Sequence, residues 1–129
     1  MVKSSLEIRL PIYYTFYKTF INIKTAIDQC NGVTCVYLVA TRAGDQCYIK
    51  VGRTANLKKR MLDYIRHNPV SRLIAYKPTS FMNSFSEEKY YHKRCKILGF
   101  KSYKFSNEWY KVTAEEYKTI TTEGFNALG

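Results

Sequence analysis

Residues Val36–Arg60, VYLVATRAGDQCYIKVGRTANLKKR, decide how this chain folds. Two runs of β-branched and apolar residues, 36–40 and 47–51, flank the turn-forming stretch Arg42–Gln46, which is the pattern of a β-hairpin. Gly52 and a basic stretch with helical spacing follow directly. The segment therefore predicts two antiparallel strands that lead through a glycine into a helix.

Side chains alternate between the two faces of a strand, so the hairpin sorts its residues into two sets. A two-residue loop at Ala43-Gly44 would place Tyr37 directly opposite Lys50. A loop at Gly44-Asp45 would shift this pairing and keep the faces. One face, which we expect to point away from the core, carries Tyr37, Val39, Tyr48, Lys50 and Gly52. The other is the predicted core face and carries Val36, Leu38, Ala40, Cys47, Ile49 and Val51.

The chain is strongly basic. It has 129 residues, enough for one domain with its own core, and 46% of them are hydrophobic. Lys and Arg number 21 against 10 acidic residues, which gives a formal charge of +11. Such a charge on a small domain calls for an anionic partner, most commonly nucleic acid. The 12 Tyr and 7 Phe residues suit stacking on bases, so composition favours binding of DNA or RNA.

The sequence shows no signal peptide and no apolar run long enough to span a membrane. Its cysteines have no paired spacing, so we expect reduced, buried thiols rather than disulfides or a zinc site. They are Cys30, Cys35, Cys47 and Cys95. We therefore expect an intracellular protein, in the cytoplasm or nucleus, with no membrane partner. Monomer and homodimer both stay open.

The rest of the chain divides into three parts. Residues 1–32 predict an N-terminal extension packed on the core, with an edge strand over Leu6–Leu10 and a helix over 12–29. Residues 33–112 form the main domain, and residues 113–129 form a short helix and a tail. The expected fold class is α+β, with a small central antiparallel or mixed sheet of three to four strands flanked by helices.

Capping and stop signals set the remaining elements. They are a helix ending near His67, a strand over 72–77, a helix opened by the capping-box pattern at Ser84 and ended at Gly99, a strand over 108–112, and a terminal helix opened at Thr113. On the first of these helices the residues expected to be buried are Leu57, Met61, Tyr64 and Ile65. Those expected to face water are Lys58, Lys59 and Arg66. The border, where a side chain can lean over a concave site while its stem packs, carries Arg60, Tyr64 and His67.

Four motifs follow one another along strand, strand, helix and helix: Val36-Tyr37, Lys50-Val51-Gly52, Leu57–Met61 and Glu88–His92. In this order, and with residues 108–110 as a closing aromatic strand, they resemble the GIY-YIG nucleases, especially the short branch of phages and large DNA viruses. The resemblance covers residues 32–112. The first signature triplet reads Cys35-Val36-Tyr37 here, and Lys50 stands where tyrosine is usual.

The resemblance implies a metal-dependent endonuclease that hydrolyses DNA by in-line attack of water. Tyr37 would be the general base. A free phenol has a pKa of about 10, and a cation such as Lys50 beside it can lower that pKa by roughly 1–3 units. Arg60 would hold phosphate oxygens with its planar fork. Glu88 would bind one Mg²⁺ or Mn²⁺, and helix geometry alone leaves Glu87 an equal candidate.

Further contacts to the nucleic-acid backbone are expected from basic side chains near these motifs, namely Arg53, Lys58, Lys59 and His92. The altered first triplet favours an alternative, a module on the same fold that binds nucleic acid without cutting it. A third interpretation is an interaction protein whose basic surface meets an acidic protein partner.

Overall fold

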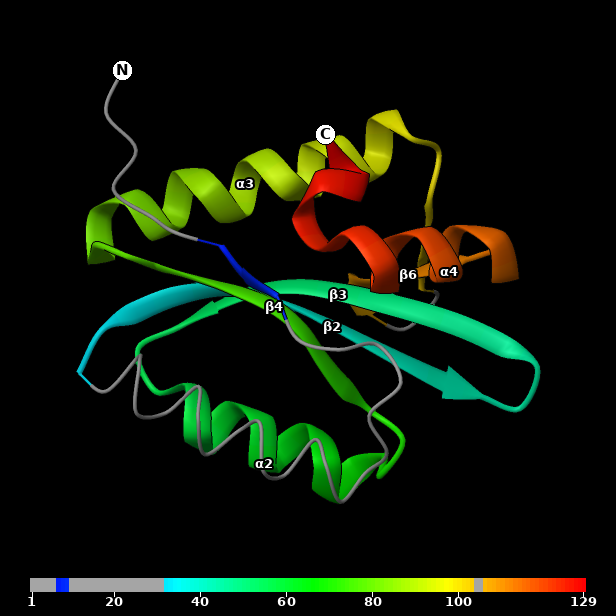
Figure 1. The fold of residues 1–129 in the computed structure, drawn as a ribbon, viewed down its shortest axis with the longest axis horizontal. Coiled ribbons are helices and arrows are strands. Elements are labelled where there is room, and N and C mark those ends of the chain that lie inside the picture. The colour runs from blue at the N-terminus through cyan, green and yellow to red at the C-terminus, as the bar shows by residue number, and fades with distance from the viewer. Residues whose placement is uncertain (1–6, 10–31, 104–105) are drawn as a thin grey trace.

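The computed structural model describes residues 7–9, 32–103 and 106–129, and these form an α+β domain (Figure 1). Six strands make one antiparallel sheet in the spatial order β1-β4-β2-β3-β6-β5. The strands are β1 (Ile8–Arg9), β2 (Thr34–Ala43), β3 (Gln46–Thr54), β4 (Arg72–Thr79), β5 (Lys101–Tyr103) and β6 (Ser106–Val112). The helices of the described residues are α2 (Leu57–His67), α3 (Phe81–Ile97), α4 (Ala114–Glu123) and a 3₁₀ helix, η1 (Gly124–Leu128). The predicted fold class is confirmed.

The sheet is larger than the three to four strands that the sequence predicts. The two additional strands, β1 with two residues and β5 with three, lie at the edges and are too short to give a periodic pattern. β1 pairs with β4, so the edge strand expected over Leu6–Leu10 is confirmed at its centre. The helix predicted over 12–29 lies outside the described residues. Within the described part of the chain, no helix has the length and apolar character needed to cross a membrane.

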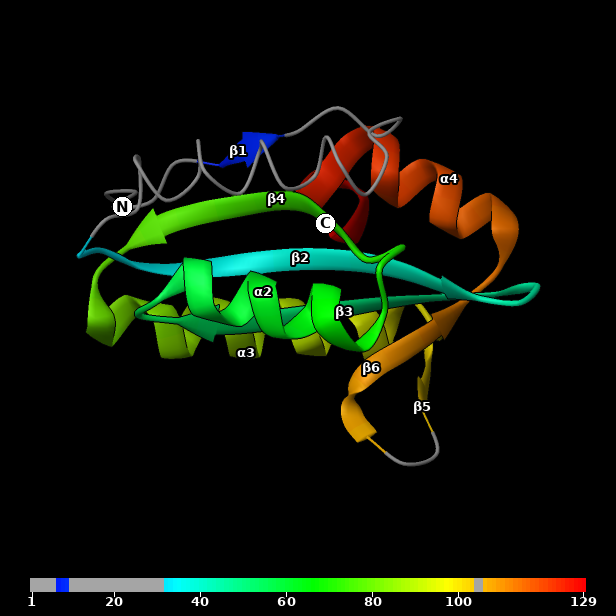
Figure 2. The same ribbon diagram turned by 90° about the horizontal axis from the view of Figure 1, so that it is seen from below.

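Helices cover both faces of the sheet. α2 lies on one face, and α3 with α4 lies on the other (Figures 1 and 2). The core under α3 and α4 includes the predicted core face of the hairpin, Val36, Leu38, Ala40, Cys47, Ile49 and Val51. A second core under α2 is built from Cys35, Tyr37, Val39, Leu57, Met61, Ile65, Leu73 and Tyr76.

The hairpin face that was expected to point away from the core is therefore buried as well. Tyr37 is 0% exposed and Lys50 is 7% exposed. The physical reason is the apolar stripe of α2, because Leu57, Met61 and Ile65 need a surface on which to pack and the hairpin supplies it. The prediction that this hairpin face is open to solvent was wrong. A buried apolar stripe was predicted for α2, but this face of the hairpin was not identified as the surface on which the stripe packs.

The hairpin turns at Gly44-Asp45, the second of the two loops considered above. Gly44 has a φ of +63°, in the left-handed region that glycine adopts without strain. Tyr37 is consequently opposite Gly52, and Lys50 lies two positions away along β3. The direct Tyr37–Lys50 pair was wrong, whereas the division of the hairpin into two faces is confirmed.

Three helix boundaries test the capping signals. α4 begins at the predicted capping box of Thr113. Gly99, with a φ of +85°, follows the end of α3 as predicted. However, α3 begins at Phe81 and already contains Ser84, where the start was predicted. The Ser80 hydroxyl caps the helix instead, accepting a hydrogen bond at 3.0 Å from the backbone N–H three residues on.

Gly52 lies against the end of the Tyr37 ring, and a Cβ at position 52 would overlap the Tyr37 hydroxyl. Because Tyr37 is packed inside the α2 core, the ring has no room to move away. We expect Gly52→Ala to lower the free energy of unfolding by about 1–3 kcal/mol, measured by denaturant titration. The loss should be smaller in a Tyr37→Phe background, which lacks the overlapping oxygen. An equal loss in both backgrounds, or no loss, would contradict this close approach.

Candidate nucleic-acid site

A pocket of about 760 Å³ lies where the end of β3 meets α2. It is rich in cationic and aromatic side chains, which are the groups that attract phosphates and stack on bases. Those that line it include Lys50, Lys59, Arg60, Tyr64, His67 and Trp109. The three border residues of α2 named by the sequence analysis all belong to this set, so their prediction as residues over a concave site is confirmed.

Lys50 brings a cation to the wall of the pocket. Its ammonium nitrogen lies 5.0 Å from the ring centroid of Tyr64 and 5.8 Å from that of Trp109. Trp109 reaches this place because it pairs with Lys50 between β6 and β3. Since Lys50 is 7% exposed, the attraction between its charge and the two rings is stronger than it would be at an open surface.

Arg60 and Lys59 enter the pocket from the first turn of α2, and both are exposed. The start of the helix is fixed by Asn56, whose side-chain oxygen accepts a hydrogen bond from the Lys59 backbone N–H at 3.1 Å. The cap thereby sets the direction in which the two basic side chains leave the backbone. Lys58, predicted as a further nucleic-acid contact, is exposed on α2 and does not line the pocket.

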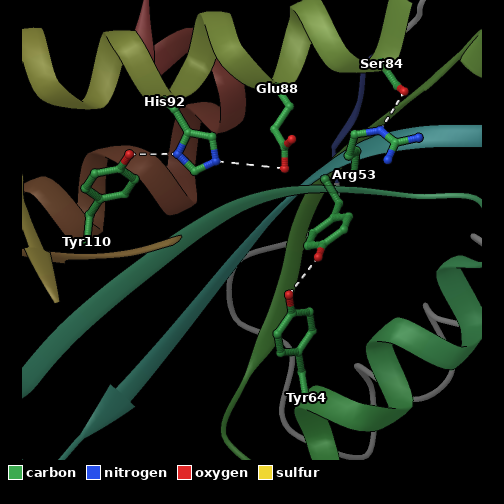
Figure 3. A network of polar contacts seen from close by, with 7 residues as sticks. Arg53, Tyr64, Ser84, Glu88, His92 and Tyr110 are labelled. Atoms are coloured by element: carbon green, nitrogen blue, oxygen red, sulfur yellow. Dashed lines mark hydrogen bonds and ion pairs between the residues drawn. The ribbon is translucent and has the colours of Figure 1, made fainter. Parts of the chain in front are cut away.

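Two tyrosines connect the α2 core to the pocket. Tyr37, the predicted general base, lies inside that core rather than on an open face. Its hydroxyl oxygen is 2.6 Å from the hydroxyl oxygen of Tyr64, which is half-buried and lines the pocket (Figure 3). Tyr64 also packs edge-on against Trp109, with ring centroids 5.9 Å apart. The buried Tyr37 hydroxyl is therefore one hydrogen bond away from a residue that lines the pocket, Tyr64.

Tyr64 is the residue that the sequence analysis undervalued. It was placed both in the buried stripe and at the border of α2, and packing was favoured over a role at the rim of the site. The signal was its spacing from Arg60, because residues four apart on a helix stand one above the other on the same side. The phenol that lines the pocket is thus supplied by the helix that also supplies the guanidinium.

Arg53 points to the other face of β3, toward the first turns of α3 (Figure 3). Its Nε donates a hydrogen bond to the Ser84 hydroxyl at 2.8 Å. Its guanidinium carbon lies 3.8 Å from the ring centroid of Phe85 and 5.1 Å from that of Phe81. Arg53 is therefore anchored on α3 and does not line the pocket.

Glu88 also comes from α3 and does not line the pocket. Its Oε2 is 3.9 Å from His92 Nε2, and the two side chains are 24% and 22% exposed. His92 Nδ1 is in turn 2.7 Å from the Tyr110 hydroxyl, and both α3 side chains are directed toward the sheet (Figure 3). The structure thus brings Lys50, Arg60 and Tyr64 together and places Glu88 across β3 from them.

Tyr110 fixes how His92 is oriented. Burial, and to a smaller extent the nearby Cys95, raises the pKa of Tyr110 to about 12. The hydroxyl therefore stays protonated and can donate to Nδ1, which leaves the Nε2 edge of the ring facing Glu88. The predicted contact of His92 with nucleic acid stays a prediction, while its contacts to Tyr110 and Glu88 are seen directly.

The two adjacent glutamates lie in different surroundings. Glu87 lines a separate pocket with Lys77 and Tyr91, whereas Glu88 faces His92 beside the sheet. Among the described residues, no three His, Cys, Asp or Glu side chains gather as a preformed metal cage. Mg²⁺ is commonly held by one or two carboxylates together with water and substrate phosphates. A single carboxylate such as Glu88 could hold such a cation only together with ligands from water and a phosphate.

Comparison with known families finds a family model that matches this chain. The model of the T5orf172 domain matches residues 34–123, from β2 through α4. The chain therefore belongs to the T5orf172 domain family, a phage-associated domain of nuclease type. No curated protein and no solved structure matches the chain. Family membership indicates a nuclease-like or DNA-binding role.

The buried ionisable groups predict how stability responds to alkaline pH. Burial raises the pKa of Cys95 from 9.0 to about 12 and that of Tyr110 from 10.0 to about 12, and it also raises the pKa of Tyr117. As the pH rises above these ordinary values, the unfolded chain loses the protons that the folded chain keeps. The free energy of unfolding should therefore fall as the pH rises through this range.

Denaturant titrations at successive pH values measure this dependence. Cys95→Ala should flatten the earliest part of the decline, since the ordinary pKa of a thiol is the lowest of the three. A free energy of unfolding that stays constant from pH 9.0 to pH 12 would contradict the burial of these groups.

Proposed function

We propose that this protein is a divalent-metal-dependent endonuclease that hydrolyses phosphodiester bonds of DNA, with the pocket between β3 and α2 as its phosphate site. The observation that carries the proposal is the convergence of Lys50, Arg60 and Tyr64 on that pocket, in a chain with a formal charge of +11. Membership of a nuclease-associated domain family supports it.

In this proposal the cations of the pocket bind the phosphate that is to be cleaved. The planar guanidinium of Arg60 can donate two parallel hydrogen bonds to phosphate oxygens. Lys50 adds a positive charge on a largely buried side chain, so its position would change little when the substrate binds. Charge that develops on the phosphate in the transition state would then meet cations already in place.

The general base in this proposal is the pair of phenols rather than Tyr37 alone. Tyr37 is buried, so an attacking water would approach from the side of Tyr64, which lines the pocket. Tyr37 would donate its hydrogen bond to a Tyr64 phenolate and stabilise the negative charge there. The Lys50 ammonium, 5.0 Å from the Tyr64 ring centroid, would place a positive charge beside the same ring. The proton of the water would pass to the Tyr64 oxygen as the new oxygen–phosphorus bond forms. The phosphorus–oxygen bond to the leaving strand breaks in the same step, and the released oxygen takes its proton from solvent water.

Glu88 would act at the end of β3. In the described residues, the last pairing between β3 and β6 joins Lys50 with Trp109. Beyond it β3 continues through Gly52 to Thr54, so side chains from α2 and α3 can approach this strand end from opposite faces. Glu88 would bind Mg²⁺ or Mn²⁺ there, with His92 holding its carboxylate in place. When bound, such a cation supplies charge neutralisation on the phosphate and on the leaving oxygen.

A second function, nucleic-acid binding without cleavage, is favoured by one observation. The pocket gathers cations and aromatic rings, whereas Glu88 and Tyr37 are both absent from its lining. A site that only holds the sugar–phosphate backbone needs the first set of groups and not the second. The cleavage assay separates the two functions.

The test is cleavage of supercoiled plasmid DNA with Mg²⁺ or Mn²⁺. We expect Arg60→Gln and Glu88→Gln to reduce the rate by about 100-fold or more, as is typical when one charge-stabilising group is lost. Tyr64→Phe and Tyr37→Phe should both be impaired, and Tyr64→Phe more severely, because its oxygen would take the proton. Arg66→Gln is the matched control, since Arg66 lies on the same helix and does not line the pocket.

Three results would contradict the proposal. A folded protein that binds DNA but cleaves neither DNA nor RNA with either metal would establish the non-catalytic alternative. Full activity of Glu88→Gln would show that Glu88 does not bind the catalytic metal. An equal loss in Arg66→Gln and Arg60→Gln would mean that the total charge of α2 matters rather than the pocket.

The salt dependence of DNA affinity tests the phosphate site independently of cleavage. Each phosphate contact contributes a slope of about −0.9 in a plot of log K against log salt concentration. Lys50→Met and Arg60→Gln should each make the slope shallower by about one contact, measured by fluorescence anisotropy. Arg66→Gln should leave it unchanged. A protein with no salt-dependent affinity for nucleic acid would instead favour an acidic protein partner.

A further inference from the structure

An apolar ridge is exposed at the start of α3. It consists of Phe81, Met82 and Phe85, which are 57%, 76% and 48% exposed. The Phe81 and Phe85 rings meet edge to face, with centroids 5.1 Å apart. Large apolar side chains that stay in water as a group usually mark a contact surface. The proposed cleavage mechanism gives these three residues no role.

The ridge carries positive charge within it. The Arg53 guanidinium is held by Ser84 (Figure 3). It is also stacked on Phe85, so a fixed cation lies against the aromatic rings. Lys89 is exposed and follows Phe85 by four residues, which places it on the same side of the helix. Aromatic rings interleaved with fixed cations are the arrangement that binds the bases and phosphates of a flexible strand.

The ridge also lies beside the candidate cleavage site. Arg53 directly follows Gly52 at the end of β3. Glu88 lies three residues beyond Phe85 and four beyond Ser84, so one side of α3 carries both the ridge and the proposed metal ligand. A strand whose phosphate reached Glu88 would have its neighbouring nucleotide within about one helical turn of the ridge.

We propose that the ridge stacks on unpaired nucleobases next to the scissile phosphate, so that the preferred substrate is DNA with a single-stranded segment at the cleavage point. This inference rests on the proposed function. In a duplex both faces of each base are covered by neighbouring bases, whereas an unpaired base offers a free π-face to Phe81 and to the Met82 thioether. The pocket then holds the backbone while the ridge selects strands with open bases.

Charge argues against a second copy of the chain as the occupant of the ridge. Two copies docked through this surface would bring Arg53 and Lys89 of each close to those of the other, and each chain has a formal charge of +11. Such like-charge contact opposes self-association, whereas a nucleic acid neutralises the same groups.

The test compares three labelled DNA ligands of one sequence, namely a single strand, a blunt duplex and a duplex with an unpaired 3′ extension. Binding is measured by anisotropy without divalent metal. We expect Phe81→Ser/Met82→Ser to weaken binding of the single strand and of the extended duplex by about tenfold or more, and to leave the blunt duplex nearly unchanged. Phe81→Trp should retain the wild-type affinities.

Ile97→Ser is the matched control, because Ile97 is 58% exposed at the far end of the same helix. It should change none of the three affinities. The inference is overturned if the ridge variant binds single strands as tightly as the wild type, or if it loses the same factor on the blunt duplex. It is also overturned if sedimentation shows a dimer that the ridge substitutions dissociate.

Two measurements keep the proposals distinguishable, namely the binding comparison in a Glu88→Gln background and cleavage by the protein with Glu88 intact. If no cleavage is found with any metal and the ridge variant still loses single-strand affinity, the cleavage mechanism fails and the ridge assignment stands. If metal-dependent cleavage is found and the ridge variant prefers the same ligands as the wild type, the ridge assignment alone fails.

Discussion

The packing of α2 against the β2–β3 hairpin is the constraint on which the candidate site depends. It buries Tyr37 beneath Gly52, and it brings Tyr64 to the edge of the same core. Because the cap at Asn56 fixes where α2 begins, the helix also presents Arg60 next to the end of β3. A core of apolar contacts thus holds the Tyr37–Tyr64 pair beside a pocket whose lining includes Lys50 and Arg60.

β3 organises the site from its other face as well. Its residues alternate, so Lys50 and Gly52 serve the α2 side while Arg53 turns to α3. The contacts of Arg53 with Ser84 and Phe85 bind the start of α3 to this strand. A substrate bound at the strand end would therefore meet one set of groups from each helix layer, which is how a small domain can surround a phosphate.

Much of this arrangement could be predicted from the sequence, because it follows from local periodicity. The two faces of the hairpin, the end of α2 at His67, the capping box at Thr113 and the border position of Arg60 are all confirmed. The main error concerns which helix packs on which face of the sheet. The alternation of the hairpin cannot reveal that α2 packs on its second face, so Tyr37 was expected in the open. Short edge strands and the early start of α3 carry too little pattern to be found.

The central claim is that the pocket and Glu88 act on one phosphate across the end of β3. The most direct measurement is a crystal structure of the protein with a non-cleavable DNA analogue and Mn²⁺, in which anomalous scattering locates the metal. The account predicts one phosphate in contact with Lys50 and Arg60, and a manganese peak shared between that phosphate and the Glu88 carboxylate. A phosphate bound in the pocket with no metal at Glu88, or a metal at Glu88 that does not contact the DNA, would contradict it.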